Sequence, residues 1–346
     1  MVMIKVAVLG AGGDVGQALS LQLRLSPFVD ELALYDRTKA AGVAVDLSHI
    51  PAKQVIKGYK SIDDGLAKIL TDADIVVITA GPSILSFAAF KTRNDLLESS
   101  AVMIGPLIES CAKICPKTII MIVSNPVNAL VPFAAERLRK HNTFDARRLF
   151  GVTTLDVVRA ETFLAEKLVT VSELEAGMEV NVIGGHSAET MVPLFSLVNV
   201  AEKLSSEQVD ELTHHTQIGG IEVLLAKDRK GGATSSTAYA TFRMVERVCR
   251  AMKGEKGMQE CTFVYMPGIE GGNEIAESIG LNFFAVPVEF APHGAGMVIN
   301  PIKGMSEKEE AMVEQSAKQL LKDIKLGSEL GKAFGIDLLK SAPEQC

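Results

Sequence analysis

The 346-residue sequence lacks several features that would place it in particular classes of protein. No apolar run reaches the roughly 18 residues that a helix needs to cross a bilayer, so we expect no membrane partner. The formal net charge is −7 and the basic residues form no cluster, which argues against nucleic acid as a partner. Hydrophobic residues make up 47% of the chain, which is enough for a large core.

Cysteine is also scarce. The five cysteines are an odd number at scattered positions, a pattern that fits a reducing compartment rather than a set of disulfides. We therefore expect a cytoplasmic protein, with the matrix of an organelle as the alternative. Cys111 and Cys115 lie one helical turn apart, but small core residues are the favoured interpretation over a metal or redox pair. No other cluster has the spacing of metal ligands, so we expect no metal.

The clearest motif lies near the start of the chain. The apolar run Lys5–Leu9 predicts a buried parallel strand, residues 17–23 predict a helix, and Glu31–Tyr35 predicts a second strand that ends at Asp36. Four glycines separate the first strand from the helix: Gly10, Gly12, Gly13 and Gly16.

This motif is typical of a dinucleotide site, although its glycine spacing is a variant and an ordinary strand–turn–helix remains the alternative. Glycines let backbone N–H groups approach a pyrophosphate, and a helix N-terminus attracts its charge. The Asp36 carboxylate would accept the ribose hydroxyls and repel a 2′-phosphate. The motif therefore predicts NAD rather than NADP as the cofactor.

Strands and helices continue to alternate up to about residue 150. We expect strands at 74–81, 118–123 and 148–152, helices at 45–49 and 94–115, and irregular structure at 62–70. This alternation predicts an α/β protein with a doubly wound parallel sheet, a Rossmann domain, over residues 1–150. The strand ends at Gly10, Gly81 and Asn125 would then face one crevice.

The pattern changes beyond residue 151. Strands that look antiparallel are expected at 178–184, 262–267 and 283–290, and helices at 206–227 and 238–252. Ser306 and Glu309 form a capping box before a last helix. We therefore expect a second, mixed α+β domain over residues 151–346 that packs closely on the first.

Three residues of this second part suggest catalysis. Asp156 and Arg159 are three apart on one helical face, and His186 follows two glycines at a strand end. Histidine exchanges protons near neutral pH, a carboxylate on its other ring nitrogen would fix the tautomer, and arginine can hold a substrate carboxylate through two hydrogen bonds. Alone, each feature is more often a surface ion pair or a core residue. Their combination with a dinucleotide motif favours a catalytic site.

Several motifs together resemble the malate dehydrogenases, on the branch of the lactate/malate dehydrogenase family that includes the mitochondrial enzymes. They span nearly the whole chain and are residues 10–17, 42–49, 92–96, 124–128, 151–160 and 184–187. The resemblance implies NAD-dependent interconversion of malate and oxaloacetate, with His186 as the acid–base residue and Asp156 as its partner. It also implies that Arg159 and Arg93 bind the substrate, and that Asn125 touches both substrate and nicotinamide.

The same resemblance places Ser100, Val123 and Thr237 beside the cofactor, although the family usually has asparagine at the first position and methionine at the third. Asp14 adds a negative charge to the glycine turn. The family usually forms homodimers or dimers of dimers, so we expect the same here, with the helix at 45–49 near the contact between subunits.

One departure concerns the substrate. Malate dehydrogenases carry an arginine in the loop after the Ala-Gly strand end, where it pairs with the second carboxylate of oxaloacetate. Here the loop is longer and has no arginine before Arg93, and Lys91 is the only other cation. A lysine does not replace a planar guanidinium, so we expect weak oxaloacetate reduction.

This departure leaves two alternatives open. One is a 2-hydroxy-acid dehydrogenase for an apolar or aromatic side chain, with a pocket lined by Ile84, Leu85, Phe87 and Phe90. The other is a non-catalytic relative that keeps the fold, which the retention of Asp156, Arg159 and His186 together disfavours.

Overall fold

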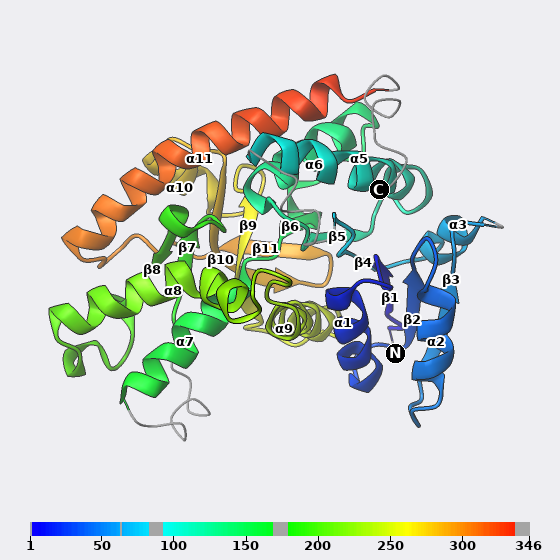
Figure 1. The fold of residues 1–346 in the computed structure, drawn as a ribbon. Coiled ribbons are helices and arrows are strands. Elements are labelled where there is room, and N and C mark those ends of the chain that lie inside the picture. The colour runs from blue at the N-terminus through cyan, green and yellow to red at the C-terminus, as the bar shows by residue number, and fades with distance from the viewer. Residues whose placement is uncertain (1, 63, 83–92, 169–178, 336–346) are drawn as a thin grey trace.

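A computed structural model describes residues 2–62, 64–82, 93–168 and 179–335 of the protein. These residues form one 11-stranded sheet with helices on both faces, shown in Figure 1. The strands are β1 (Lys5–Leu9), β2 (Glu31–Tyr35), β3 (Val55–Tyr59), β4 (Ile75–Ile78), β5 (Ile119–Ile122), β6 (Leu149–Gly151), β7 (Val182–Gly184), β8 (Met191–Pro193), β9 (Gln259–Tyr265), β10 (Phe283–Ala291) and β11 (Gly294–Val298).

The first six strands are parallel and lie in the order β3-β2-β1-β4-β5-β6, which is the order of a doubly wound dinucleotide-binding fold. Strands β4 and β5 are buried at every position because helices cover both faces of the sheet. This explains why both strands read as continuous apolar runs without alternation. The α/β class with a doubly wound parallel sheet is thus confirmed.

The second half of the chain extends the same sheet. Strand β9 pairs antiparallel with β6, through Gly151 and Phe263, and the sheet continues as β9-β10-β7-β8. Strand β11 pairs with β10 as an antiparallel hairpin. The two halves therefore share backbone hydrogen bonds as well as a packed interface.

The helices are α1 (Asp14–Leu25), α2 (Ala40–Ser48), α3 (Gly65–Leu70), α5 (Arg93–Ile114), α6 (Val127–Lys140), α7 (Thr154–Leu168), α8 (Ser206–Ala226), α9 (Ser235–Met252), α10 (Gly272–Ile279) and α11 (Glu307–Ala333). Helices α5, α6 and α11 lie on one side of the strands, and α1 and α9 pack together on the other, as Figure 1 shows. No helix in the described part of the chain is both long and apolar enough to cross a membrane.

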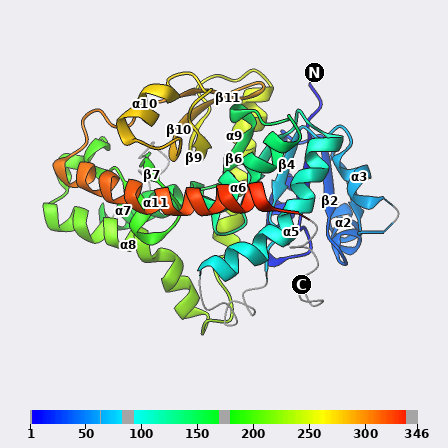
Figure 2. The same ribbon diagram turned by 90° about the horizontal axis from the view of Figure 1, so that it is seen from above.

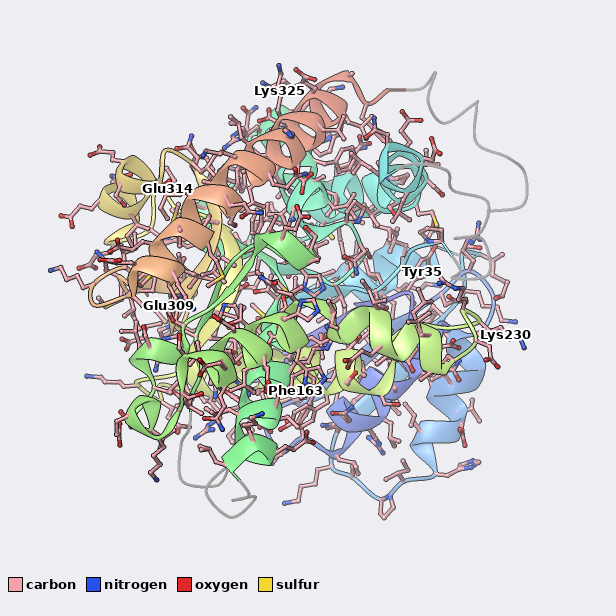
Figure 3. The ribbon with its side chains drawn as sticks, turned by 60° about the vertical axis from the view of Figure 1, so that its left-hand side comes forward. Tyr35, Phe163, Lys230, Glu309, Glu314 and Lys325 are labelled. Atoms are coloured by element: carbon pink, nitrogen blue, oxygen red, sulfur yellow. The ribbon has the colours of Figure 1, made fainter. Side chains whose placement is uncertain are left out.

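The long helix α11 joins the two halves. It packs along α6 of the first half and against β7 and β8 of the second, and Figure 2 shows it crossing the molecule. The expected capping box at its start is present, because the Ser306 hydroxyl accepts the Glu309 N–H while the Glu309 carboxylate accepts the Ser306 N–H. Figure 3 shows Glu309, Glu314 and Lys325 along this helix.

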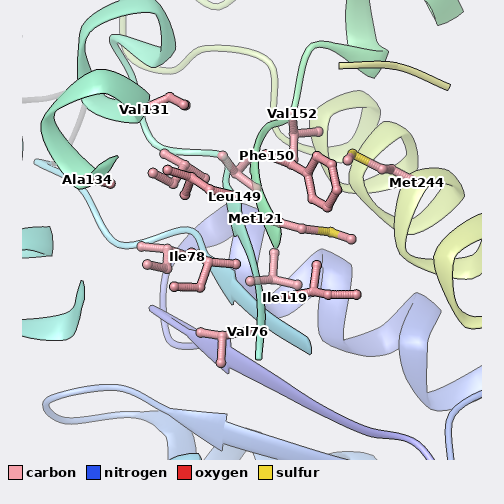
Figure 4. Packing of buried hydrophobic residues seen from close by; sticks show 14 of the residues in the cluster. Val76, Ile78, Ile119, Met121, Val131, Ala134, Leu149, Phe150, Val152 and Met244 are labelled. Carbon is pink, nitrogen blue, oxygen red and sulfur yellow. The ribbon is translucent and has the colours of Figure 1, made fainter. Parts of the chain in front are cut away.

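The largest buried cluster of apolar side chains surrounds the central strands. In Figure 4, Val131 and Ala134 of α6 approach the strands from one side, and Met244 of α9 approaches from the other. Phe150 of β6 lies between them and is fully buried. The core is therefore continuous across the point where the sheet changes from parallel to antiparallel.

Several local predictions differ from the structure, and the elements β8, β11, α6 and α10 were not predicted. Residues 65–70, within the segment that we expected to be irregular, form helix α3, and strand β3 was not predicted at all. Gly58 lies in the middle of β3 because α2 packs so closely that a Cβ there would come within 2.4 Å of the Ala40 carbonyl oxygen. A glycine inside an edge strand weakens the sequence signal for that strand.

Candidate active site

The glycine turn after β1 is shaped by close packing. Gly10 has a φ of +96°, and a Cβ at Gly16 would lie 2.2 Å from the Gly10 carbonyl oxygen. Gly13 is the N-cap of α1 and provides no side-chain cap. The first N–H groups of α1 therefore have no side-chain acceptor at the cap, which suits an incoming phosphate oxygen.

Asp36 lies beside this turn, at the end of β2. Its Oδ1 accepts hydrogen bonds from the N–H groups of Thr38 and Lys39, each at 2.9 Å. Burial alone would raise the pKa of Asp36, but these bonds outweigh it and lower the pKa below the usual value, so the carboxylate is ionised at neutral pH. A Cβ at Gly12 would lie 2.5 Å from Asp36 Cγ, so glycine is needed for the turn to approach this charge. The residues present fit a dinucleotide with a free ribose 2′-hydroxyl.

The predicted proton-transfer pair is assembled. Asp156 is fully buried at the start of α7, and its Oδ2 lies 2.7 Å from Nδ1 of His186, which follows β7. The backbone N–H of His186 also donates to Oδ1 of Asn128, at 2.8 Å. With Nδ1 held by a carboxylate, Nε2 is the ring nitrogen left to exchange a proton with a substrate.

Arg159 lies one turn after Asp156 on α7, with Nη1 at 3.8 Å from Asp156 Oδ1. Burial lowers the pKa of Arg159, and the carboxylates of Asp156 and Glu222 partly offset this. Space for the guanidinium comes from two glycines of α8. A Cβ at Gly219 would lie 3.0 Å from Arg159 Cδ, and one at Gly220 would lie 3.7 Å from Nη1.

His186 borders a cavity of about 530 Å³, a size typical of small-molecule sites. His186 lines it together with three other residues predicted from the sequence, Val123, Asn125 and Thr237. Gly220 also lines it, so the Arg159 guanidinium lies directly behind one wall. The structure thus brings an acid–base pair, an amide side chain and a guanidinium together around one cavity.

Other predicted residues lie nearby but do not line this cavity. Ser100 is buried in α5, and its hydroxyl donates to the Asn125 carbonyl oxygen at 2.8 Å, so it supports the backbone of a lining residue. Gly81 follows β4, where a Cβ would come no closer than 4.0 Å to Ser124. The glycine turn and Asp36 are not among the lining residues.

The loop expected to set substrate specificity, residues 83–92, lies outside the described residues. The predictions for Lys91, Ile84, Leu85, Phe87 and Phe90 therefore stay predictions. Arg93 begins α5, but its side chain also lies outside the described part. Within that part, no group of three or more His, Cys, Asp or Glu side chains is placed to hold a metal ion.

Sequence reasoning missed two polar residues of the site. Asn128 bonds the His186 backbone through Oδ1, while its Nδ2 donates to Asp323 of α11 at 3.1 Å. The sequence feature that could have identified Asn128 is its position as the second asparagine of the 124–128 motif. Arg229 lines the cavity from the loop between α8 and α9. The sequence feature that contains it is the segment Lys227-Asp228-Arg229-Lys230, which does not indicate which cation faces inward.

The chain matches two family models. One, described as the NAD binding domain of lactate/malate dehydrogenase, covers residues 4–151, and the other, the α/β C-terminal domain of the same family, covers residues 153–330. The first match confirms NAD as the predicted cofactor.

Curated relatives and solved structures agree with these matches. The chain is 41% identical over 324 residues to the mitochondrial malate dehydrogenase of Saccharomyces cerevisiae, covering 93% of this chain and 92% of the relative. It is 39% identical over 331 residues to that of Homo sapiens, covering 95% and 92%. The apo malate dehydrogenase from Picrophilus torridus superimposes with a TM-score of 0.79 at 23% identity, over 95% of this chain and 98% of that one. The predicted resemblance is confirmed.

Proposed function

Because the chain belongs to the lactate/malate dehydrogenase family and is an NAD-dependent oxidoreductase, we propose that it interconverts malate and oxaloacetate at the cavity lined by His186. The observation that carries this proposal is the 2.7 Å contact between His186 Nδ1 and the buried Asp156 carboxylate, with Arg159 beside it. This arrangement suits proton exchange at an oxygen whose carbon gains or loses a hydride.

Each residue has a defined task in the reaction. Bound NAD supplies or accepts the hydride. In the reducing direction His186 donates its Nε2 proton to the carbonyl oxygen of the substrate, and in the oxidising direction Nε2 accepts the hydroxyl proton. Asp156 holds the ring in the required tautomer and stabilises its charged form. Arg159 binds the carboxylate next to the reacting carbon and so orients that carbon.

Replacing His186 with alanine tests the proposal. We expect turnover to fall by about 10²–10⁴-fold, which is the usual contribution of a positioned acid–base group. NADH affinity, measured by fluorescence titration, should change little. His293→Ala, at an exposed position, is the matched control. Turnover that survives H186A nearly intact would remove His186 from the mechanism.

The identity of the substrate is tested separately. Steady-state rates with oxaloacetate, pyruvate and phenylpyruvate, each with NADH, separate the malate reaction from the alternative of an apolar or aromatic 2-hydroxy acid. The sequence favours that alternative only through the missing loop arginine. The assembled His186–Asp156 pair argues against a non-catalytic relative.

Roles for the other residues are part of the proposal. Gly10, Gly12, Gly13 and Gly16 bind the pyrophosphate, and Asp36 binds the adenosine ribose. Residues Gly81, Ser100, Val123, Asn125 and Thr237 surround the nicotinamide half, and Arg93 joins Arg159 at the substrate. The division into an NAD-binding domain, 1–150, and a catalytic domain, 151–346, is supported by the change from parallel to antiparallel pairing after β6.

We propose a homodimer, or a dimer of dimers, with α2 near the contact. Val45 on α2 is 60% exposed, and Leu21 and Leu25 on the neighbouring α1 are also exposed, which is costly for apolar side chains in water. Sedimentation equilibrium measures the oligomeric state directly.

We also propose a reducing compartment, the cytoplasm or an organelle matrix. The structure supports this because four cysteines are free and buried: Cys111, Cys115, Cys249 and Cys261.

A further inference from the structure

We propose that Arg229 binds the distal anionic group of the substrate and so makes the cavity selective for dicarboxylic 2-oxo acids. This inference rests on the proposed function, since it names the group that meets the second carboxylate of oxaloacetate. It also supplies a guanidinium for the second carboxylate, which the sequence lacks in the loop at 83–92 because that loop contains no arginine.

Arg229 is placed at the cavity by the connection between two helices that form its walls. Leu224 of α8 and Thr237 of α9 both line the cavity, and Arg229 lines it from the loop between them. The Arg229 N–H donates to the Leu224 carbonyl oxygen at 2.8 Å, and Arg229 has a left-handed φ of 59°. Lys227 braces the loop, because its Nζ donates to the Gly232 carbonyl oxygen at 2.9 Å. The loop that carries Arg229 therefore has a defined shape.

The charge of Arg229 is available to a ligand. No carboxylate among the described residues forms an ion pair with it, whereas Arg159 has Asp156 and Arg243 has Glu161 and Glu260. Among the described residues that line the cavity, Arg229 is also the only one with a permanent charge. A substrate with one carboxylate needs only Arg159 and Arg93, the two residues proposed for the carboxylate next to the reacting carbon. The second carboxylate of a dicarboxylic substrate matches the Arg229 guanidinium, which can bind it through two hydrogen bonds.

The position of Arg229 favours the substrate over the cofactor phosphates. His186 lines the same cavity as Arg229, but Gly10, Gly13 and Asp36, where the pyrophosphate and ribose are expected, do not. Arg229 therefore shares its cavity with the acid–base histidine and not with the residues expected at the pyrophosphate. It is exposed, so it lies where the cavity meets solvent, on the path of an entering anion. Its neighbour Lys230 does not line the cavity and lies at the edge of the molecule in Figure 3.

The test compares Arg229→Met with Lys230→Met, two substitutions that remove one positive charge from the same loop. The substrates are oxaloacetate and 2-oxobutanoate, which has the same chain length without the second carboxylate. We expect R229M to lower kcat/KM for oxaloacetate by about 10- to 100-fold, the range for one lost hydrogen-bonded charge. The value for 2-oxobutanoate and the KM for NADH should stay within about twofold, and K230M should resemble the wild type.

Arg229→Lys should recover part of the loss, because it restores the charge without the planar fork. Equal losses on the two substrates, or a loss that appears as a raised KM for NADH, would overturn the inference.

A second measurement separates this inference from the proposed function. If the wild type does not reduce oxaloacetate, the proposed substrate is wrong. Arg229 is then tested alone, by measuring how strongly the dianion malonate inhibits reduction of the 2-oxo acid that the enzyme reduces fastest. Weaker malonate inhibition in R229M, with unchanged inhibition in K230M, supports the inference. Equal malonate inhibition in R229M and the wild type overturns it.

Discussion

Replacing Asp156 with asparagine isolates the contribution of one buried charge to proton transfer. The substitution keeps the shape of the side chain but exchanges an acceptor-only carboxylate for an amide that can donate. In the wild type, Asp156 Oδ2 accepts from His186 Nδ1 at 2.7 Å, so the proton stays on Nδ1 and Nε2 is free to accept one. An amide N–H2 facing Nδ1 would stabilise the opposite tautomer, with the proton on Nε2.

The expected size of the effect follows from these contacts. A hydrogen bond to a charged group is worth about 1.5–3 kcal/mol, which corresponds to roughly 10- to 150-fold in rate. Stabilising the wrong tautomer raises the loss toward about 10⁴-fold, as in hydrolases with an analogous pair. We therefore expect kcat for malate oxidation to fall by about 10²–10⁴-fold. Stability should change far less, because removing a fully buried charge also removes its desolvation cost.

The assay follows NADH absorbance during malate oxidation and, in parallel, the midpoint of urea unfolding. Asp210→Asn is the control, since Asp210 is exposed and pairs with Lys308 at the surface. A kcat within tenfold of the wild type would refute the reasoning. A collapse of stability in D156N would assign Asp156 a structural role instead.

Three further predictions follow from the contacts described. Asp36→Ala should narrow the preference for NADH over NADPH, measured as the ratio of kcat/KM, because repulsion of the 2′-phosphate is lost. Gly219→Ala should raise the KM for the 2-oxo acid several-fold without lowering the melting temperature, because the new Cβ would lie 3.0 Å from Arg159 Cδ and displace the guanidinium. Arg243→Met should cost about 1.5–3 kcal/mol in urea unfolding, because it removes the 2.8 Å partner of the buried Glu260 and leaves Arg247, at 3.2 Å, as the remaining guanidinium. Burial raises the pKa of Glu260, so this deficit should shrink as the pH falls and the carboxyl gains a proton in the folded state.

Controls from the same chain make these tests specific. Gly42→Ala is the match for G219A, since a Cβ at Gly42 meets no atom within 4 Å. Arg250→Met is the match for R243M, because its partner Glu255 is exposed and such pairs contribute about 1 kcal/mol or less. If G42A raised the KM as much as G219A, or R250M destabilised the protein as much as R243M, the corresponding prediction would be wrong. An unchanged preference for NADH in D36A would contradict the prediction for Asp36.

The sequence predicted those parts of the fold that depend on local pattern. The strands at 5–9 and 119–122 are buried on both faces, so an uninterrupted apolar run identified them. The pairing of Asp156 with His186 was predicted because the chemistry of a hydride-transfer site requires both groups near each other. Strand β3 was missed because its signal is interrupted by Gly58, and only the packing of α2 explains that glycine.

The residues that the sequence did not reveal depend on tertiary structure. Arg229 and Lys230 are adjacent cations, and only the path of the loop after α8 decides which one lines the cavity. Asn128 is one of many asparagine residues in turns and helix starts. Its role depends on the approach of His186 from a strand of the other half of the chain.

The antiparallel join between β6 and β9 has a consequence for the way the chain folds during synthesis. The first six strands emerge in order and can form the parallel part of the sheet, but β6 is then an open edge. Its partner β9 is made only after α7, β7, β8, α8 and α9. During that interval the unpaired N–H and C=O groups of β6 are free to pair with a strand of another chain. Aggregation of the newly made chain should accordingly rise with the rate of synthesis, although the native sheet has no gap at that position.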